Sequence, residues 1–176
     1  MKNYDFTQKF KVIYDKGVAL YAQGQRGAET FFSADEKAWL ASVGITSQHL
    51  YDYAEDQVGG GEPGYDNALA IELVRRDYFL SAQHGQPSKT VLDESSLAPK
   101  DQAVEGITWL PRIIPKAKAK LKGELPASLM YCCGGDRRFF KTNDILPSEF
   151  LALIWRNLND DQATVAWVAS RAKTAR

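Results

Sequence analysis

The spacing of the apolar residues constrains the fold of this chain more than any other feature of its sequence. Apolar residues recur at steps of three and four along most of the chain, as they do on one face of an α-helix, and the period-two alternation typical of strands is nearly absent. The first such segment spans residues 7–22 and includes Phe10 and Ile13. The sequence therefore predicts an all-α fold, a compact multi-helix bundle with at most a short β pair near Leu129 and Cys132.

Local signals indicate where the later helices begin. The stretch SADE, residues 33–36, forms a capping box in which Ser33 accepts a hydrogen bond from an early backbone N–H and Glu36 reaches back. Asp66 is expected at the start of a long fourth helix. Pro115 and Pro147 are expected at helix starts, because the N–H that proline lacks has no helical partner there.

The helical spacing is lost once, over the polar segment 85–106, which contains two prolines. We expect an N-terminal helical half at 1–84 and a C-terminal helical half at 107–176, which together form one structural unit. Apolar side chains such as Val91 and Leu97 gain nothing in a free linker. The segment 85–106 is therefore predicted to be a strap that packs against both halves.

The two halves show the same order of helices, breaks and bulky residues. At an offset of 100 residues, Lys16 falls on Lys116 and Glu36 falls on Asp136, and a shift to 95 residues then aligns the last helix of each half. Few residues are identical. A weak tandem duplication explains the shared order, but two halves of one helical bundle would share it in any case, so both interpretations stay open.

Charge and hydropathy narrow the classes of function. The chain holds 22 Lys and Arg against 22 Asp and Glu, with a pI of about 6.7, which argues against the concentrated basic face of a duplex-binding protein. The first residues, MKNYDFTQKF, lack a signal-peptide core, and the apolar run FLALIW is far short of a membrane span. We therefore expect a cytoplasmic protein with reduced cysteines, and neither nucleic acid nor a membrane as its partner.

Neither a cofactor nor a metal is predicted. The glycine run at residues 59–64 contains G-x-G-x-x-G, but it follows an amphipathic helix instead of a buried strand, which indicates a helix end and a turn. His49 and His84 share no ligand spacing with Cys132 and Cys133, and the chain holds no further cysteine for a structural zinc site.

The most unusual stretch is YCCGGDRRFF, residues 131–140, and it allows two interpretations. Adjacent cysteines cannot form an ordinary disulfide, because their Cα atoms lie too close together. In the first interpretation, one thiol packs in the core, the two glycines make a turn and Asp136 caps a helix. In the second, Arg112, Asp136, Arg137 and a neighbouring thiol form a small polar pocket, in which two guanidiniums bind a carboxylate or phosphate.

The same region resembles a known family. WLPRIIPKAKAKLKGEL followed by YCCGGDRRFF, from Trp109 to Phe140, is similar to a bacterial family described as domain of unknown function 5069. The shared features are a Leu-Pro-Arg start to a helix rich in Lys, Arg and Ala, a Tyr-x-Cys segment, an Asp and a pair of aromatic residues. The matching positions are Leu110, Pro111, Arg112, Lys116, Ala119, Tyr131, Cys132 or Cys133, Asp136, Arg137, Phe139 and Phe140. The resemblance implies an architecture and a region for the site, but no particular reaction.

These observations lead us to expect a non-catalytic bacterial protein that binds a small anionic ligand or a protein partner. The candidate pocket comprises Arg112, Tyr131, Cys132, Cys133, Asp136 and Arg137. The alternative is an enzyme or a redox-responsive protein that uses the thiol of Cys132 or Cys133, since a helix N-terminus and a nearby cation favour a thiolate. The sequence leaves open the oligomeric state and which of the two thiols faces the pocket.

Overall fold

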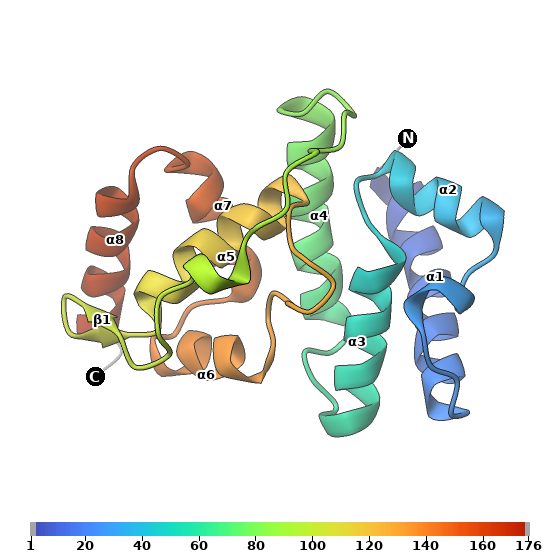
Figure 1. Ribbon diagram of the computed structural model, residues 1–176, viewed down its shortest axis with the longest axis horizontal. Helices are drawn as coiled ribbons and strands as arrows, with labels where there is room; N and C mark the ends of the chain where they lie inside the picture. Colours follow the sequence, from blue (N-terminus) through green and yellow to red (C-terminus); the bar gives the residue numbers. More distant parts are fainter. Residues whose placement is uncertain (1–2, 175–176) are drawn as a thin grey trace. The chain divides into compact units, whose positions relative to one another are not determined.

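A computed structural model describes residues 3–174 of the chain. Over these residues the helical prediction is confirmed, because the structure consists of eight α-helices and a single two-stranded antiparallel sheet (Figure 1). The chain separates into two compact units, residues 1–85 and residues 86–176. The boundary lies at the point where the helical spacing of the sequence is lost.

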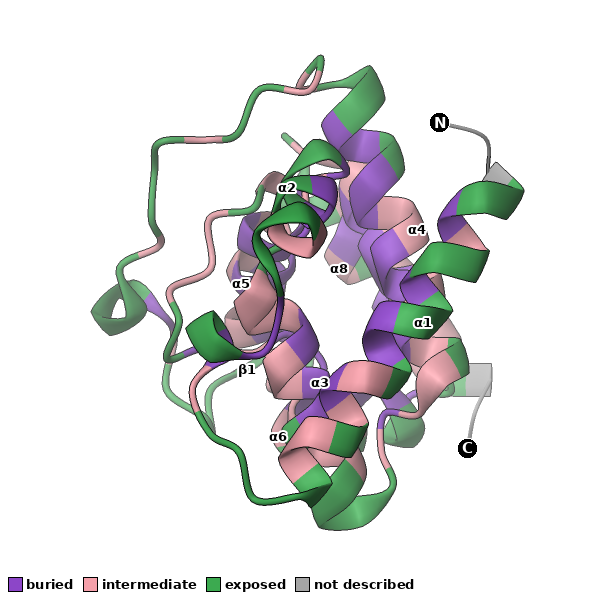
Figure 2. Cartoon of the chain, turned by 90° about the vertical axis from the view of Figure 1, so that its right-hand side faces the viewer, coloured by how far each residue is buried: buried purple, intermediate pink, exposed green. Residues whose placement is uncertain are grey.

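The N-terminal unit is built from four helices. They are α1 (Asn3–Ala22), α2 (Ala34–Ser42), α3 (Ser47–Gly60) and α4 (Tyr65–Ser81), with a short 3-10 turn η1 (Ala28–Thr30) before α2. α1 has buried residues along one side and exposed residues along the other, as its apolar spacing predicts (Figure 2). On the buried side, the Phe6 ring stacks on Phe10 and on Trp39, with 5.7 Å between ring centroids in both pairs. Aromatic stacking therefore packs the start of α1 against α2 on this buried side.

Local capping sets the helix starts of this unit. The capping box is confirmed: Ser33 accepts from the Glu36 backbone N–H, and the Glu36 carboxylate accepts from the Ser33 N–H. The Thr46 hydroxyl caps α3 by accepting from the His49 N–H. α4 begins one residue earlier than expected, at Tyr65, directly after Gly64.

The C-terminal unit also contains four helices. They are α5 (Leu110–Lys122), α6 (Gly134–Thr142), α7 (Pro147–Arg156) and α8 (Asp161–Thr174), preceded by the 3-10 turn η2 (Glu94–Ser96) and the strands β1 (Ala103–Val104) and β2 (Ile107–Thr108). Pro147 begins α7 as predicted. The prediction for Pro115 is wrong, because Pro111 occupies the first turn of α5 and Pro115 lies inside the helix.

The short strand pair lies at a different place from the one predicted. β1 and β2 pair Ala103 with Thr108 and Val104 with Ile107, so Glu105 and Gly106 form a two-residue hairpin loop. Both loop residues have positive φ, 51° and 74°, which is the backbone that such a tight loop needs. The region near Leu129 and Cys132 is irregular instead, because Cys132 has a φ of 72° and turns the chain away from an extended course.

Within the predicted strap, segment 85–106, residues 86–102 follow the surface of the C-terminal unit, and residues 103–106 form β1 and its hairpin loop. The Leu92 N–H donates to the Glu124 carbonyl at 2.8 Å, the Ser88 hydroxyl donates to the Glu124 carboxylate at 2.7 Å, and Leu97 is buried. Val91 is 65% exposed, so the expectation that it packs inward is wrong. Packing of the strap against the N-terminal half stays a prediction.

The two units repeat one another in the order and spacing of their helices. α2 and α6 begin 100 residues apart, as do α3 and α7, and α4 and α8 begin 96 residues apart. An offset of 96 also pairs buried Ala68 with buried Thr164 and buried Glu72 with buried Val168, which corrects the predicted offset of 95 by one residue. The correspondence between the halves is therefore a property of the structure as well as of the sequence pattern.

Candidate functional site

The candidate site lies where the chain enters α6. Cys132 has the left-handed backbone already noted, and Cys133 then adopts an extended conformation with φ −63° and ψ 173° as the cap residue of α6. Gly134 and Gly135 are therefore the first residues of the helix and do not form the expected turn. Asp136 is the third helical residue, so the prediction that it is the cap residue is wrong.

Asp136 is completely buried and lies at the centre of a polar network. Its Oδ2 accepts from the Cys132 backbone N–H at 2.9 Å, and its Oδ1 accepts from the indole Nε1–H of Trp109 at 3.0 Å. The Nζ of Lys116 lies 2.7 Å from the same Oδ2, and the Lys116 side chain is only 1% exposed. A buried charge of either sign is stable only with such partners, so the pair fixes the start of α6 against α5.

Lys116 joins this carboxylate to a thiol. Its Nζ also donates to the Cys133 sulfur at 3.2 Å. Neither cysteine takes part in a disulfide, and Cys132 is buried whereas Cys133 is partly exposed. Cys133 is therefore the thiol that both a buried ammonium and an external reagent can reach.

Tyr131 acts as a structural anchor beside this network. Its hydroxyl donates to the Pro147 carbonyl at 2.8 Å, and its ring meets Phe140 edge to face at 5.8 Å. Burial, reinforced by Cys132 and Asp136, raises the pKa of Tyr131 well above its usual value. The phenol therefore stays protonated and ties the start of α6 to the start of α7.

The two arginines of the predicted pocket each bind a backbone carbonyl. Arg112 donates to the Ala98 carbonyl of the strap at 2.9 Å and lies over the Trp109 ring at 5.9 Å. Arg137 donates to the Cys132 carbonyl at 2.8 Å, one turn along α6 from the thiol of Cys133. The cation that the structure places against Asp136 is Lys116 and not a guanidinium.

The Trp109 ring fills the space that a side chain at position 135 would need, which explains the glycine there. A Cβ at this position would lie 2.4 Å from the Trp109 ring, which is closer than any side chain tolerates. The neighbouring Gly134 has ordinary space, since its nearest contact would be Arg137 at 3.8 Å. The close approach of Gly135 lets the indole reach Asp136.

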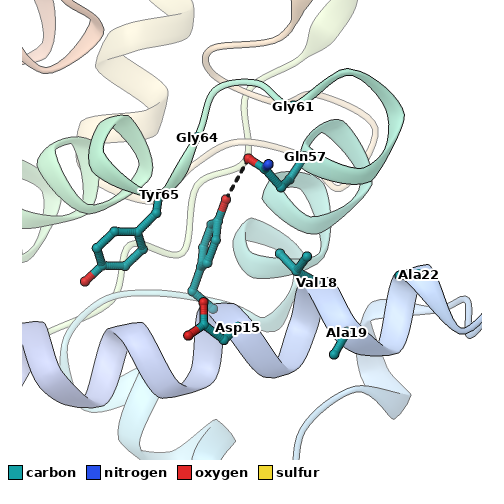
Figure 3. A pocket seen from close by; sticks show the side chains of 9 residues that line it. Asp15, Val18, Ala19, Ala22, Gln57, Gly61, Gly64 and Tyr65 are labelled. Carbon is teal, nitrogen blue, oxygen red and sulfur yellow. Dashed lines mark hydrogen bonds between the residues drawn. The ribbon is translucent and has the colours of Figure 1, made fainter.

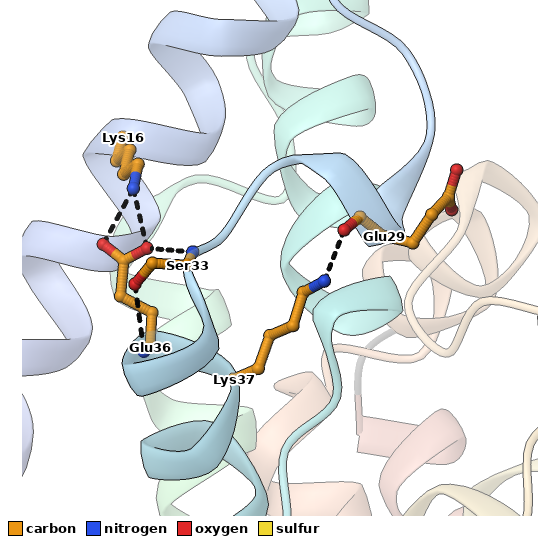
Figure 4. A network of polar contacts seen from close by, with 5 residues as sticks. All are labelled: Lys16, Glu29, Ser33, Glu36 and Lys37. Atoms are coloured by element: carbon orange, nitrogen blue, oxygen red, sulfur yellow. Dashed lines mark hydrogen bonds and ion pairs between the residues drawn. The ribbon is translucent and has the colours of Figure 1, made fainter.

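The N-terminal unit holds the equivalent ion pair in a more exposed setting (Figure 4). Lys16 Nζ lies 2.6 Å from Glu36, with the two side chains 39% and 22% exposed, and Glu36 also closes the capping box with Ser33. Burial acts to raise the pKa of Glu36, but the hydrogen bonds from Lys16 and Ser33 outweigh it and lower that pKa below its usual value. Ser33 stands at the position of Cys133, so the thiol and the deep burial distinguish the C-terminal unit.

Sequence reasoning missed Lys116 and Trp109 as site residues. The offset of 100 that aligns Lys16 with Lys116 and Glu36 with Asp136 was the signal that could have found the lysine. Trp109 gave no comparable signal, because it reaches Asp136 only through the backbone turn at its own position, where φ is 77°.

A second buried polar cluster, in the N-terminal unit, was also missed. Glu72 on α4 is fully buried and accepts from the Tyr53 hydroxyl at 2.8 Å, and His49 Nδ1 lies 3.7 Å from the same carboxylate oxygen. Arg75, one turn further along α4, donates to Gln83 at 3.0 Å and lies over the Phe79 ring. The spacing of Glu72 and Arg75 on one helix was the available signal.

Two kinds of feature are absent from the part of the chain that the structure describes. Within residues 3–174, no three His, Cys, Asp or Glu side chains are grouped so that they could hold a metal ion. Over the same residues, no helix combines the length and apolar character needed to cross a bilayer.

Fold and site together define a helical protein with a buried Lys–Asp pair that contacts a free thiol. Residues 96–176 match the model of the family described as domain of unknown function (DUF5069), which confirms the resemblance for the C-terminal part of the chain. This match includes α5 and α6 and therefore the whole Asp136 network. No curated protein and no solved structure is matched by the chain.

Proposed function

We propose that the C-terminal unit is a redox-responsive module in which Cys133 is the reacting thiol. The observation that carries the proposal is the contact of 3.2 Å between the buried Lys116 ammonium and the Cys133 sulfur. An adjacent ammonium and the N-terminal end of a helix both stabilise negative charge on sulfur, and the thiolate is the form of cysteine that reacts. Cys133 lies beside the Lys116 ammonium and at the N-terminal end of α6, and its side chain is partly exposed.

The reaction that we propose is reversible formation of a mixed disulfide. The Cys133 thiol loses its proton to solvent, and the thiolate attacks one sulfur of a small disulfide RS–SR. A Cys133–SR bond forms, the S–S bond of the reagent breaks, and RS⁻ leaves. A second thiol reverses the step. Such chemistry needs a compartment where the thiol is otherwise reduced, and the bacterial cytoplasm expected from the sequence is part of the proposal.

In this proposal the small anionic ligand expected from the sequence is the disulfide RS–SR itself, with negative charge on its R groups. Arg137 follows Cys133 by one helical turn, and Arg138 beside it is exposed. Two guanidiniums carried by the first turns of the helix that Cys133 caps would favour a disulfide that bears carboxylates. Lys116 donates to the sulfur and the Tyr131 hydroxyl donates to Pro147, so neither is placed as a general base. We therefore propose a sensor that responds to its ligand and passes the change to a protein partner, without turning over a substrate.

The test compares disulfides of different charge as reagents. Native protein is treated with oxidised glutathione, which carries carboxylates, and with the cationic disulfide cystamine, and the modified residue is located by peptide mass spectrometry. We expect Cys133 to be modified, Cys132 to stay protected by burial, and oxidised glutathione to be the faster reagent after correction for the rate with a free cysteine peptide. Equal modification of the two cysteines, or faster reaction with cystamine, would contradict the proposal.

Matched variants isolate the role of the ammonium. Lys116→Arg keeps a cation beside the sulfur, whereas the double variant Lys116→Met with Asp136→Asn removes both charges of the pair. We expect the double variant to react about tenfold more slowly and Lys116→Arg to retain most of the rate. Ser33→Cys supplies a thiol at the equivalent cap of α2 as the reference. A rate for Cys133 no higher than that of this reference thiol would refute the role of Lys116.

A further inference from the structure

A pocket of about 400 Å³ opens in the N-terminal unit, between α1 and the segment that joins α3 to α4 (Figure 3). α1 contributes Tyr14, Asp15 and Val18, and the facing wall is formed by Gln57 at the end of α3 and Tyr65 at the start of α4. The volume falls within the range of small-molecule sites. None of these residues takes part in the Cys133 chemistry.

Two aromatic rings and one carboxylate give this pocket its character. The Tyr14 and Tyr65 rings meet edge to face, with 5.4 Å between centroids and an interplanar angle of 70°. The Tyr14 hydroxyl donates to Gln57 Oε1 at 3.2 Å, as Figure 3 shows. Burial, assisted by the charge of Asp15, raises the pKa of Tyr14 to about 12. Burial also raises the pKa of Tyr65, so both rings are neutral at neutral pH, and their electron-rich faces attract cations.

An ammonium group of the chain itself already lies at the edge of this pocket. Lys11 Nζ is 5.0 Å from the centroid of the Tyr65 ring and 2.5 Å from Asp15 Oδ2. The Lys11 and Asp15 side chains are 48% and 55% exposed. An ion pair this exposed contributes little to stability and exchanges readily with other ions. The Tyr65 ring and the Asp15 carboxylate thus together bind the ammonium group of Lys11. An external ammonium can take the place of this Lys11 group.

We propose that this pocket binds a small organic cation, a primary or quaternary ammonium compound, with its charge between Tyr65 and Asp15 and its apolar part against Val18. The wall near Gly61 and Gly64 leaves room for such a ligand, because a Cβ at either glycine would meet no atom within 4 Å. The net charge of residues 1–85 is 8 − 12 = −4, which attracts cations to this unit. The proposal is independent of the thiol chemistry of the C-terminal unit.

The test uses choline and its neutral carbon analogue, 3,3-dimethyl-1-butanol. Binding is followed by saturation-transfer NMR on the ligand and by chemical-shift changes in protein labelled at tyrosine. We expect choline to bind and to shift the signals of Tyr14 and Tyr65, and the neutral analogue, which has the same shape, to bind at least tenfold more weakly. Equal binding of the two compounds would overturn the proposal.

Variants at the two charged residues give opposite predictions. Lys11→Met removes the internal competitor and should tighten choline binding by about three- to tenfold, whereas Asp15→Asn should weaken it by a similar factor. Tyr65→Phe keeps the ring face and should bind as the wild type does, and Tyr65→Leu should lose about tenfold. Asp35→Asn, an exposed carboxylate on α2, serves as the control. Binding that is unchanged by Asp15→Asn, or no binding to either the wild type or Lys11→Met, would refute the cation site.

Discussion

The replacement of Asp136 by asparagine tests the buried network most directly. Asparagine has nearly the same shape and keeps an oxygen that can accept from the Trp109 indole N–H. It removes the negative charge that lies 2.7 Å from Lys116 Nζ, and its NH₂ group, which can only donate, would face the Lys116 ammonium, which is also a donor. Were Asp136 only a helix cap, asparagine would substitute for it with little loss.

The expected loss is large because both partners are buried. The side chains of Lys116 and Asp136 are 1% and 0% exposed, so the variant leaves an ammonium away from water without its counter-ion. Breaking a buried pair in this way costs about 3–5 kcal/mol, whereas losing a neutral cap costs about 1 kcal/mol. Asp136→Asn should therefore lower the free energy of unfolding of the C-terminal unit by about 3 kcal/mol or more.

Urea unfolding followed by tryptophan fluorescence measures this loss. Trp109, Trp155 and Trp167 lie in the C-terminal unit and Trp39 alone lies in the N-terminal unit, so the signal reports chiefly on the unit that carries the variant. A double-mutant cycle with Lys116→Met then isolates the pair. We expect the double variant to be more stable than Asp136→Asn alone, because it leaves no unpaired charge.

The equivalent pair of the N-terminal unit provides a matched control. Lys16 and Glu36 are partly exposed, so the cycle formed by Lys16→Met and Glu36→Gln should give a coupling energy of only about 0.2–1 kcal/mol. An Asp136→Asn variant within 1 kcal/mol of the wild type would refute the reasoning. So would a coupling energy for Lys116 and Asp136 no larger than that of the exposed pair.

Three further predictions follow from the packing of the described residues. Gly135→Ala should destabilise the protein by about 1–3 kcal/mol, because the new Cβ collides with an indole ring, whereas Gly134→Ala should be neutral or slightly stabilising; thermal unfolding of the two variants compares them. The pKa of Tyr131 is raised on folding, so its contribution to stability is fully present below pH 10 and is lost as the pH rises above that value; denaturant unfolding at pH 8, 10 and 11 should show the decline, which should be smaller in Tyr131→Phe. Leu97→Ala in the strap should cost about 2–3 kcal/mol and Val91→Ser less than about 0.5 kcal/mol, and equal losses in urea unfolding would contradict the burial of these two side chains.

The sequence by itself determined the helices of this protein and most of their starts. The capping box at Ser33 and the first-turn position of Pro147 are confirmed because both depend on residues no more than four positions apart. The repeat of the helix order was visible for the same reason, since apolar spacing is a local property. Pro115 was placed wrongly because Pro111 offered an equally good first turn four residues earlier, and spacing alone does not decide between two such prolines.

Only the tertiary structure decided the chemistry of the candidate site. Asp136 pairs with Lys116, twenty residues away, because the left-handed turns at Trp109 and Cys132 bring the starts of α5 and α6 together. Positive φ at a tryptophan or a cysteine has no sequence signal, since these residues rarely adopt it and do so only where surrounding contacts outweigh the strain. Burial has no sequence signal here either. Lys16 and Lys116 occupy matching positions in the two halves of the sequence. Because the packing around them differs, Lys16 forms a partly exposed ion pair with Glu36, whereas Lys116 is buried and contacts the thiol of Cys133.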